Sequence, residues 1–474
     1  MANIKNKVKF VCTDCGAESP RWLGRCPMCG AWNTMEEMAE RRVSGKAPVV
    51  SAIGASRGPV KLSDIGEEKK TRLCLRMPEV DRPLGGGIVE GSVILLGGEP
   101  GIGKSTLVFQ ICRAVCEGGR SVLYATGEES EIQIKMRADR LGIDGRLCTV
   151  MSGAELSSIL EEAKTMRPAL LVVDSIQTLY TEGNESPMGS PGQIRDCTAL
   201  LVRLAKEYDI AVMVIGHVTK EGNLAGPRLL EHMVDAVLYL EGDRSYQFRV
   251  LRTVKNRFGS TAETGLFVME ERGLRGIEDP SGYLLKTRGD STAGSIVMAS
   301  MEGQRPILAE IQALSVHSVL AVPRRISVGY ELSRLIVLLA VLEKRAKISF
   351  SAEDVYINVA GGFRIRETAA DLAVALAVVS VKWDVPLPHE LAAFGEVGLT
   401  GDVLPVSHIG LRLKESEKMR FTHFILPEGN RKDAEAYFRE QGRASSRVRY
   451  VSKVSEALAV LRGEEAAGRR NAPI

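Results

Sequence analysis

Eight consecutive residues have the types and spacing that bind the phosphates of a nucleotide. They read Gly98, Glu99, Pro100, Gly101, Ile102, Gly103, Lys104 and Ser105. Glycines allow backbone N–H groups to approach phosphate oxygens without a Cβ in between, and the lysine reaches the β- and γ-phosphates. The serine hydroxyl is a ligand for Mg²⁺. This loop, together with Thr106, therefore predicts a site for ATP and Mg²⁺.

The chain on either side of the loop predicts the strand and the helix that must position it. The apolar run Ser92 to Leu96 precedes the loop, and the helix-like stretch Thr106 to Gln110 follows it. A helix that begins at this point directs the positive end of its dipole at the phosphates. Further strand-like runs alternate with amphipathic stretches, at 121–126, 169–174, 210–216 and 236–240. This alternation predicts an α/β fold with a parallel-rich sheet between helices, in which ligands bind at the carboxyl ends of strands.

Polar residues that end these runs are the candidates for chemistry. Asp174 ends one run and is predicted to hold Mg²⁺ beside the serine of the loop. Glu128 follows another run and could polarise the water that attacks the γ-phosphate. Its neighbour Glu129 is the rival, because spacing does not rank two adjacent carboxylates. His217 ends a third run, where either a γ-phosphate sensor or an ordinary structural histidine would fit.

Four of the nine cysteines form two tight pairs near the N-terminus. Cys12 and Cys15 make one pair, Cys26 and Cys29 make the other, and a glycine follows each pair. Four thiolates at this spacing are typical of tetrahedral zinc, and so short a segment needs a metal to be stable. A redox role would need only one pair. The sequence therefore predicts a zinc ribbon, and whether it contacts protein or DNA stays open.

The composition is that of a globular protein with several domains. The chain has 474 residues, of which 45% are hydrophobic and 26% charged, and its net charge is +3. With so small a net charge, any contact with nucleic acid must come from local basic patches. The N-terminus has no apolar signal core, and the longest apolar stretches are too short to span a bilayer. We therefore expect a cytoplasmic protein without a membrane segment.

Several motifs together resemble the RadA family of bacterial DNA repair proteins, also called Sms, over nearly the whole chain. Besides the cysteine pairs and the phosphate loop, these motifs are the runs 126–130, 216–222, 225–228 and 255–259. The resemblance implies a central domain like that of RecA, which assembles as a homohexameric ring on DNA and uses ATP to drive branch migration of recombination intermediates. It also implies three partners, which are the RecA recombinase, single-stranded DNA and branched DNA.

Two basic residues in the last of these runs, Lys255 and Arg257, are predicted to point to one side of an extended segment. In RecA-like rings the corresponding residues resemble fingers that reach the γ-phosphate bound by the next subunit, so we expect catalytic roles for both. Direct contact with DNA phosphates is the alternative. By the same resemblance, Lys220 and Arg228 are expected in loops that face DNA in the pore of the ring.

Beyond position 288 the pattern of strands and helices changes and predicts a second, α+β domain. Its run Gly395 to Gly401 resembles the proteolytic domain of Lon, an ATP-dependent protease. The position of the Lon nucleophilic serine falls on Ala369, whose methyl group cannot attack a peptide bond. The position of the Lon lysine falls on Gly410, and Lys414, one helical turn further, would be a base without a nucleophile. We therefore expect a proteolytically inactive scaffold that supports the ring.

The expected domains are a zinc ribbon at 1–38, a linker at 39–60, a RecA-like ATPase domain at 61–288, the Lon-like domain at 289–462 and a disordered tail at 463–474. The Lon-like domain holds four candidate DNA contacts that an ordinary solvated surface would explain as well: Lys344, Arg345, Arg364 and Arg366. Two rival functions are an ATP-dependent protease and an ATPase that remodels protein partners without DNA.

Overall fold

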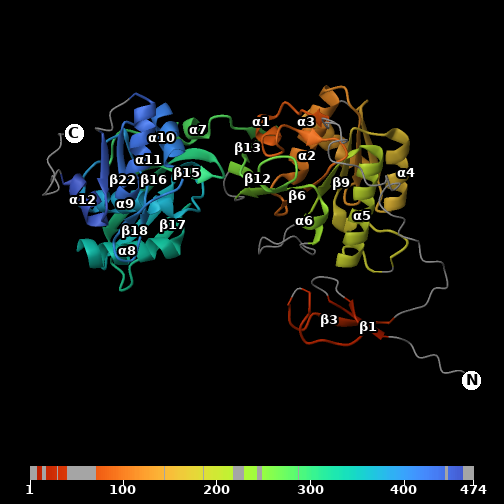
Figure 1. The fold of residues 1–474 in the computed structure, drawn as a ribbon, viewed down its shortest axis with the longest axis horizontal. Helices are drawn as coiled ribbons and strands as arrows, with labels where there is room; N and C mark the ends of the chain where they lie inside the picture. The colour runs from red at the N-terminus through yellow and green to blue at the C-terminus, as the bar shows by residue number, and fades with distance from the viewer. Residues whose placement is uncertain are drawn as a thin grey trace, which may run out of the picture. The chain divides into compact units, whose positions relative to one another are not determined.

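The computed structural model contains two compact units, which divide between Gly276 and Ile277 (Figure 1). The described residues are 8–12, 18–28, 30–39, 71–143, 145–184, 186–216, 229–242, 248–286, 288–442 and 447–462. Most of the predicted linker and the whole predicted tail lie outside them. In the described part of the chain, no helix is both long enough and apolar enough to cross a membrane.

The N-terminal ribbon is a three-stranded antiparallel sheet in the order β2-β1-β3. Its strands are β1 (Val8–Cys12), β2 (Glu18–Ser19) and β3 (Met35–Ala39). Cys12, Cys26 and Met35 are buried together, and Phe10 packs against them. So few apolar side chains do not stabilise a fold of this size without another contribution. Two of the four predicted zinc ligands therefore lie at the centre of this small core.

The first unit is built on a nine-stranded sheet in the order β14-β13-β12-β11-β6-β10-β9-β7-β8. Its parallel strands are β6 (Val93–Gly98), β7 (Val122–Thr126), β8 (Cys148–Ser152), β9 (Leu170–Asp174), β10 (Ala211–Ile215) and β11 (Ala236–Gly242). Its antiparallel strands are β12 (Phe248–Asn256), β13 (Thr264–Glu270) and β14 (Gly273–Gly276). A separate short pair is β4 (Arg72–Leu73) with β5 (Ile88–Val89). The predicted parallel-rich α/β fold is confirmed.

Helices cover both faces of this sheet (Figure 1). They are α1 (Pro78–Asp81), α2 (Lys104–Glu117), α3 (Glu131–Leu141), α4 (Leu156–Met166), η2 (Ile176–Thr178), α5 (Pro191–Tyr208) and α6 (Leu229–Met233). Apolar residues of α2 share a core with Ile94 and Leu96 of β6, whereas α4 and α5 share the other core with Val93 and Leu95. Alternate side chains of β6 thus supply two cores, which explains why this strand reads as a continuous apolar run.

The sequence did not predict β8. This strand pairs only with β7 at the edge of the sheet, and most of its side chains are partly exposed. An edge strand that is half open to solvent needs no continuous apolar run. The pattern that revealed the inner strands therefore misses it.

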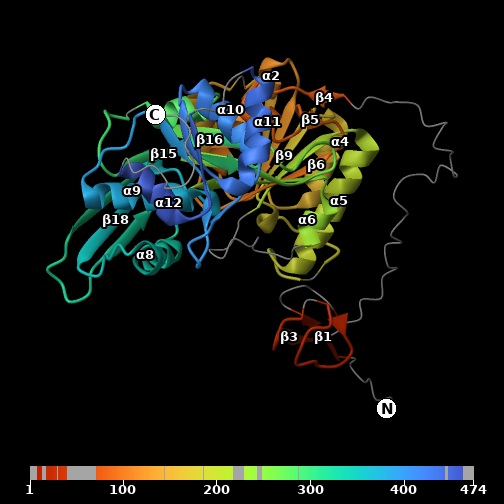
Figure 2. The ribbon, with the colours of Figure 1, turned by 60° about the vertical axis from the view of Figure 1, so that its left-hand side comes forward.

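The second unit has a seven-stranded mixed sheet in the order β17-β18-β16-β15-β19-β22-β23 (Figure 2). Its strands are β15 (Ser295–Glu302), β16 (Arg305–His317), β17 (Arg325–Val328), β18 (Glu353–Val359), β19 (Leu391–Ala393), β22 (His423–Pro427) and β23 (Val448–Val451), and a separate pair is β20 (Glu396–Val397) with β21 (Val403–Leu404). Its helices are α7 (Pro280–Leu285), α8 (Leu332–Ala346), η3 (Ala360–Gly362), η4 (Thr368–Ala370), α9 (Asp371–Trp383), α10 (Ile409–Lys418), η5 (Glu428–Asn430), α11 (Arg431–Glu440) and α12 (Val454–Leu461).

Two groups of helices pack against this second sheet (Figure 2). Helix α9 packs against β15 and β16, and α8 and α12 pack against α9. Helix α10 shares a core with Val297 and Ala299 of β15. The predicted α+β domain is confirmed. Helix α7 also packs against β16, so the compact unit includes residues from Ile277 onward, whereas the sequence places the boundary at 288.

Candidate nucleotide-binding site

The phosphate loop joins β6 to α2, and its backbone conformation requires glycine. Gly103 has a φ of 115°, and a Cβ at this position would lie 2.7 Å from Cε of Met269. Because this glycine is the N-cap of α2, no side chain caps the first turn of the helix. The N–H groups of that turn are open to an anion, which the helix dipole also favours. The loop therefore fits the phosphates of a nucleotide.

Lys104 is the first residue of α2 and is only 4% exposed. Its Nζ donates hydrogen bonds to the carbonyl oxygens of Gly98 at 2.8 Å and Glu99 at 3.0 Å, which hold the ammonium group against the loop. Burial lowers the pKa of Lys104, and the negative charges of Asp174 and Glu128 oppose this by favouring the charged form. One buried cation thus lies near two carboxylates and the loop.

Asp174 is the last residue of β9 and lies at the carboxyl edge of the sheet, opposite the end of β7. Its carboxylate accepts hydrogen bonds from the hydroxyl of Tyr124 at 2.6 Å and from the hydroxyl of Ser105. Burial raises the pKa of Asp174, while these two hydrogen bonds act in the opposite direction. The structure therefore brings the two predicted Mg²⁺ ligands into direct contact.

Tyr124 is a site residue that the sequence reading missed. It lies in the middle of β7, is fully buried, and stacks on Phe109 of α2 with ring centroids 4.6 Å apart. A buried tyrosine needs a hydrogen-bond partner. A tyrosine in the middle of a strand of mainly apolar residues was therefore the available signal that a polar group lies beside β7.

The structure distinguishes the two adjacent glutamates that follow β7. Glu128 accepts a hydrogen bond at 2.5 Å from the hydroxyl of Ser175, the residue after Asp174. Glu129 instead forms an ion pair with Arg137 of α3. Glu128 is therefore the carboxylate directed toward the end of β9, where Asp174 lies.

The two predicted finger residues lie at the amino-terminal ends of the parallel strands, whereas the phosphate loop lies at their carboxyl ends. Asn256, which stands between them, pairs with Ala236 at the start of β11, whereas Leu240 near the end of β11 pairs with Gly98. Four residues of strand separate these two levels by about 13 Å. An extended arginine or lysine side chain is shorter than this distance. Both side chains are therefore too far along the sheet to reach the loop of their own subunit.

Lys255 is tied to α6, and Arg257 is tied to the residue just before β11. Lys255 Nζ donates to the carbonyl oxygen of Glu231 at 2.7 Å, and Arg257 forms an ion pair with Asp235 at 3.3 Å. Asp235, which the sequence reading missed, is buried and also accepts hydrogen bonds from the backbone N–H of Val93 and from Lys206. The side chain of Arg257 remains 56% exposed. The structure therefore orients this arginine at the surface of the subunit.

Five predicted site residues lie outside the described part of the chain: Cys15, Cys29, His217, Lys220 and Arg228. Their roles stay predictions. The other two predicted zinc ligands, Cys12 and Cys26, are 1% and 2% exposed and share one core. Thiols from two separate segments of the ribbon that share one core fit a zinc site whose remaining ligands come from the two other cysteines.

Comparison with family models supports the division of the chain into three parts. A model described as an AAA domain matches residues 70–223, and one described as a rubredoxin metal binding domain matches 10–37. A third, the Lon protease (S16) C-terminal proteolytic domain, matches 336–462. The AAA match implies ATP and Mg²⁺ at the phosphate loop, and the rubredoxin match supports zinc in the ribbon.

Similar proteins cover almost the whole chain. The DNA repair protein RadA of Bacillus subtilis (strain 168) is 47% identical over 429 residues, which are 90% of this chain and 93% of the relative. The chain belongs to the RadA family. The DNA repair protein RadA of Haemophilus influenzae is 43% identical over 464 residues, which are 96% of this chain and 98% of the relative. The resemblance drawn from the sequence motifs is confirmed, and the RadA architecture explains why an ATPase domain and a Lon-like domain occur together.

In the Lon-like unit, an ion pair lies close to Ala369 and Gly410, the two residues that the sequence aligns with the Lon serine and lysine. Arg412 is fully buried, and its two terminal nitrogens donate to the two carboxylate oxygens of Glu367 at 2.7 Å each. Glu367 stands two residues before Ala369, and Arg412 stands two residues after Gly410. Ala369 is buried and its carbonyl accepts from the N–H of Gly395 at 2.8 Å. Ala369 is therefore part of the packed interior of this unit.

Breaking this pair is expected to destabilise the Lon-like unit. In Glu367→Gln the buried Arg412 loses its counter-charge, so we expect the free energy of unfolding to fall by about 3 kcal/mol. This is the lower end of the usual range for a buried ion pair, because Glu367 is partly exposed. Hydrogen exchange of α10 amides in the full chain measures this loss. The control is Glu428→Gln, whose partner Arg431 is exposed and which we expect to change stability by less than about 1 kcal/mol. Equal protection in both variants would contradict a stabilising role.

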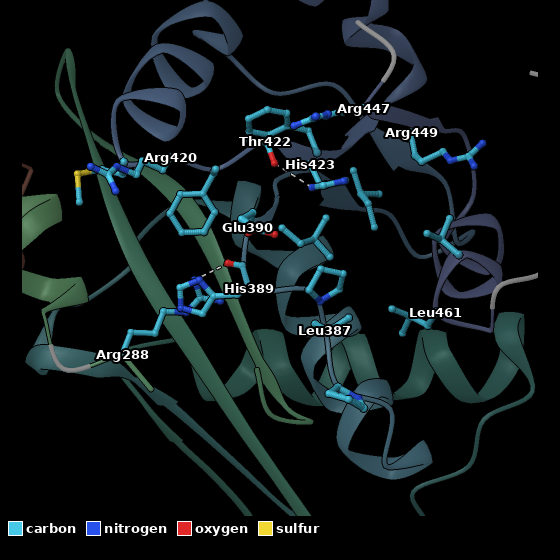
Figure 3. Close-up of a pocket in the computed structure, with 18 of the residues that line it drawn as sticks. Arg288, Leu387, His389, Glu390, Arg420, Thr422, His423, Arg447, Arg449 and Leu461 are labelled. Atoms are coloured by element: carbon cyan, nitrogen blue, oxygen red, sulfur yellow. Dashed lines mark hydrogen bonds between the residues drawn. The ribbon is translucent and has the colours of Figure 1, made fainter. Parts of the chain in front are cut away.

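The Lon-like unit also contains a basic cavity of about 1030 Å³ (Figure 3). Its basic lining residues are Arg288, His389, Arg420, His423, Arg447 and Arg449. The side chain of Arg288 is 6% exposed, donates to the carbonyl oxygen of His389 at 2.7 Å and lies over the ring of Phe421. The described lining includes no serine or cysteine, and its hydroxyl side chain is Thr422, which shares a hydrogen bond with Nδ1 of His423 at 3.0 Å.

Proposed function

We propose that this RadA protein is a DNA-dependent ATPase, a motor of the helicase class that acts in recombinational DNA repair in the cytoplasm and promotes branch migration. The observation that carries the ATPase part is the grouping of Lys104, Asp174 and Glu128 around the phosphate loop. The DNA part rests on the relatives, which are DNA repair proteins, and on the resemblance to RecA-like rings.

In this proposal each residue of the site has one task. Backbone N–H groups of the loop bind the phosphates, and Lys104 stabilises the negative charge on the transferred group. Ser105 and Asp174 would hold Mg²⁺, which would supply positive charge to neutralise the phosphates. Glu128 orients the attacking water and accepts its proton.

Lys255 and Arg257 are proposed to complete the site of a neighbouring subunit in a homohexamer. Their position at the end of the sheet away from their own loop supports this assignment, because it leaves both side chains free of the task of binding the nucleotide of their own subunit. Direct contact with DNA phosphates is the alternative. Each site would then be complete only within the ring, which couples hydrolysis to contacts between subunits.

The proposed substrates are single-stranded and branched DNA, and the proposed protein partner is the RecA recombinase. Lys220 and Arg228 are proposed to contact the phosphates of DNA in the pore. Contacts of this kind make binding strongly dependent on salt and only weakly dependent on sequence. The Lon-like domain is proposed to be a proteolytically inactive scaffold, which the burial of Ala369 supports.

ATP turnover of the purified chain, measured with and without single-stranded DNA, tests the proposal. We expect turnover that rises when DNA is added, and a loss of about 100- to 1,000-fold in Lys104→Ala under both conditions. An ATPase that remodels proteins would show no response to DNA. Degradation of casein in the presence of ATP would instead support the protease alternative and contradict the scaffold role.

A further inference from the structure

Two tryptophans of the zinc ribbon are exposed to solvent. Trp22 is 55% exposed and Trp32 is 70% exposed. An indole left in water forgoes a large part of its hydrophobic stabilisation, so paired exposed tryptophans commonly mark a binding surface. Nothing in the proposed ATP site uses them.

The two indoles are held as neighbours by a hairpin. Backbone hydrogen bonds join Asn33 to Gly24 at 2.8 Å, and Arg25 forms a bridge with Trp32. A side chain at Gly24 would have its Cβ 3.6 Å from Cη2 of Trp22 and 4.0 Å from Cζ3 of Trp32. Glycine thus leaves a backbone surface bordered by both rings. Because the hairpin is closed by backbone bonds, ordering this surface for a ligand costs little entropy.

The segment that carries the two rings contains basic residues and no acidic one. Arg25 lies over the ring of Trp32, with its guanidinium carbon 5.8 Å from the ring centroid, and its Nε donates to the carbonyl oxygen of Gly30. Arg21 is the other charged residue between positions 19 and 34, a segment that contains no acidic residue. Aromatic faces combined with nearby arginines suit a ligand with planar rings and negative charge.

We propose that Trp22 and Trp32 form a stacking platform for unpaired bases of single-stranded nucleic acid, with Arg21 and Arg25 contacting its phosphates. Bases in a duplex are already stacked and do not offer their faces, whereas unpaired bases do. The positive charge of the segment favours this ligand over an uncharged apolar protein surface. This inference rests on the proposed function, since it assigns the ribbon a task in the binding of DNA by the motor.

Intrinsic fluorescence tests the platform directly, because the chain has only three tryptophans. The third, Trp383, lies in the Lon-like unit under the guanidinium of Arg462. Titrating the full, zinc-loaded chain with oligodeoxythymidine is expected to quench the emission of the ribbon tryptophans. An oligomer of the same length without bases carries the same phosphates, and we expect it to leave the emission unchanged.

Substitutions separate stacking from charge. We expect Trp22→Ala and Trp32→Ala each to weaken binding of the oligonucleotide by about 5- to 150-fold. Trp22→Phe and Trp32→Phe keep an aromatic face and should restore most of the affinity. Trp383→Phe is the matched control and should retain both affinity and quenching. Zinc content, measured for each variant, reports whether the ribbon is still folded.

Two results would overturn the platform. If labelled oligonucleotide binds while tryptophan emission and the affinity of the alanine variants stay unchanged, the ribbon does not stack on bases, although the DNA-dependent motor remains supported. If quenching requires the RecA recombinase and not DNA, the surface docks a protein. Failure of every form of the chain to bind DNA would instead contradict the proposed function itself.

Discussion

Replacing Glu128 by glutamine is expected to lower ATP turnover by about 100- to 10,000-fold while ATP still binds. The amide keeps the size of the side chain and its contact with the hydroxyl of Ser175, but it does not accept a proton from the attacking water. Turnover in the presence of DNA and equilibrium binding of a fluorescent ATP analogue measure the two effects separately. Loss of binding together with turnover would indicate a misplaced loop instead of a missing base.

The matched control is Glu129→Gln. This change removes the ion pair with Arg137 on α3 but leaves the contact between Glu128 and Ser175 intact. We expect turnover within about tenfold of the unmodified chain, because a partly exposed ion pair contributes little. If Glu129→Gln were the inactive variant and Glu128→Gln the active one, the assignment of the base would be reversed.

Subunits that carry Lys104→Ala, mixed with subunits that carry Arg257→Ala, are expected to recover ATP turnover that neither variant has alone. Lys104→Ala alone should lose about 100- to 1,000-fold, because it lacks the phosphate-binding lysine. Arg257→Ala alone should lose about 1,000-fold or more, because it lacks the finger. In a mixed ring, an intact loop from one variant can meet an intact finger from the other. Random mixing at equal amounts completes about a quarter of the interfaces.

The double variant, with both Lys104→Ala and Arg257→Ala, provides the control for this experiment. Mixed with either single variant it creates no complete interface, so turnover should stay absent. Folding is not expected to confound the result, because Arg257 is largely exposed and its ion pair with Asp235 is long at 3.3 Å. If mixtures of the single variants stay inactive at every ratio, Arg257 does not act across subunits.

Local pattern was sufficient to predict the inner strands and the phosphate loop. Strand β6 is buried on both faces and reads as an apolar run, and the glycines that follow it are needed for the backbone approach to phosphate. Asp174 was found in the same way, because it ends another such run. Edge strand β8 was missed, since its half-exposed residues leave no such run.

The local sequence pattern did not predict contacts between side chains that lie far apart in the chain. Spacing did not rank Glu128 against Glu129, and only the packing of β7 beside β9 brings the first of them to Ser175. The ion pair of Arg412 and Glu367 joins residues that lie 45 positions apart, and no sequence motif predicts this contact.

The sequence by itself determined that this chain holds a phosphate loop between a strand and a helix, a pair of C-x-x-C motifs and a Lon-like domain without the Lon serine. These features depend on residue types and short spacings, which constrain the backbone directly. Tertiary structure alone decided that the fingers lie at the opposite edge of the sheet from their own loop and that the two ribbon tryptophans face solvent. Both depend on strand register and on which side chains the core leaves outside, and these follow from packing between segments far apart in the chain.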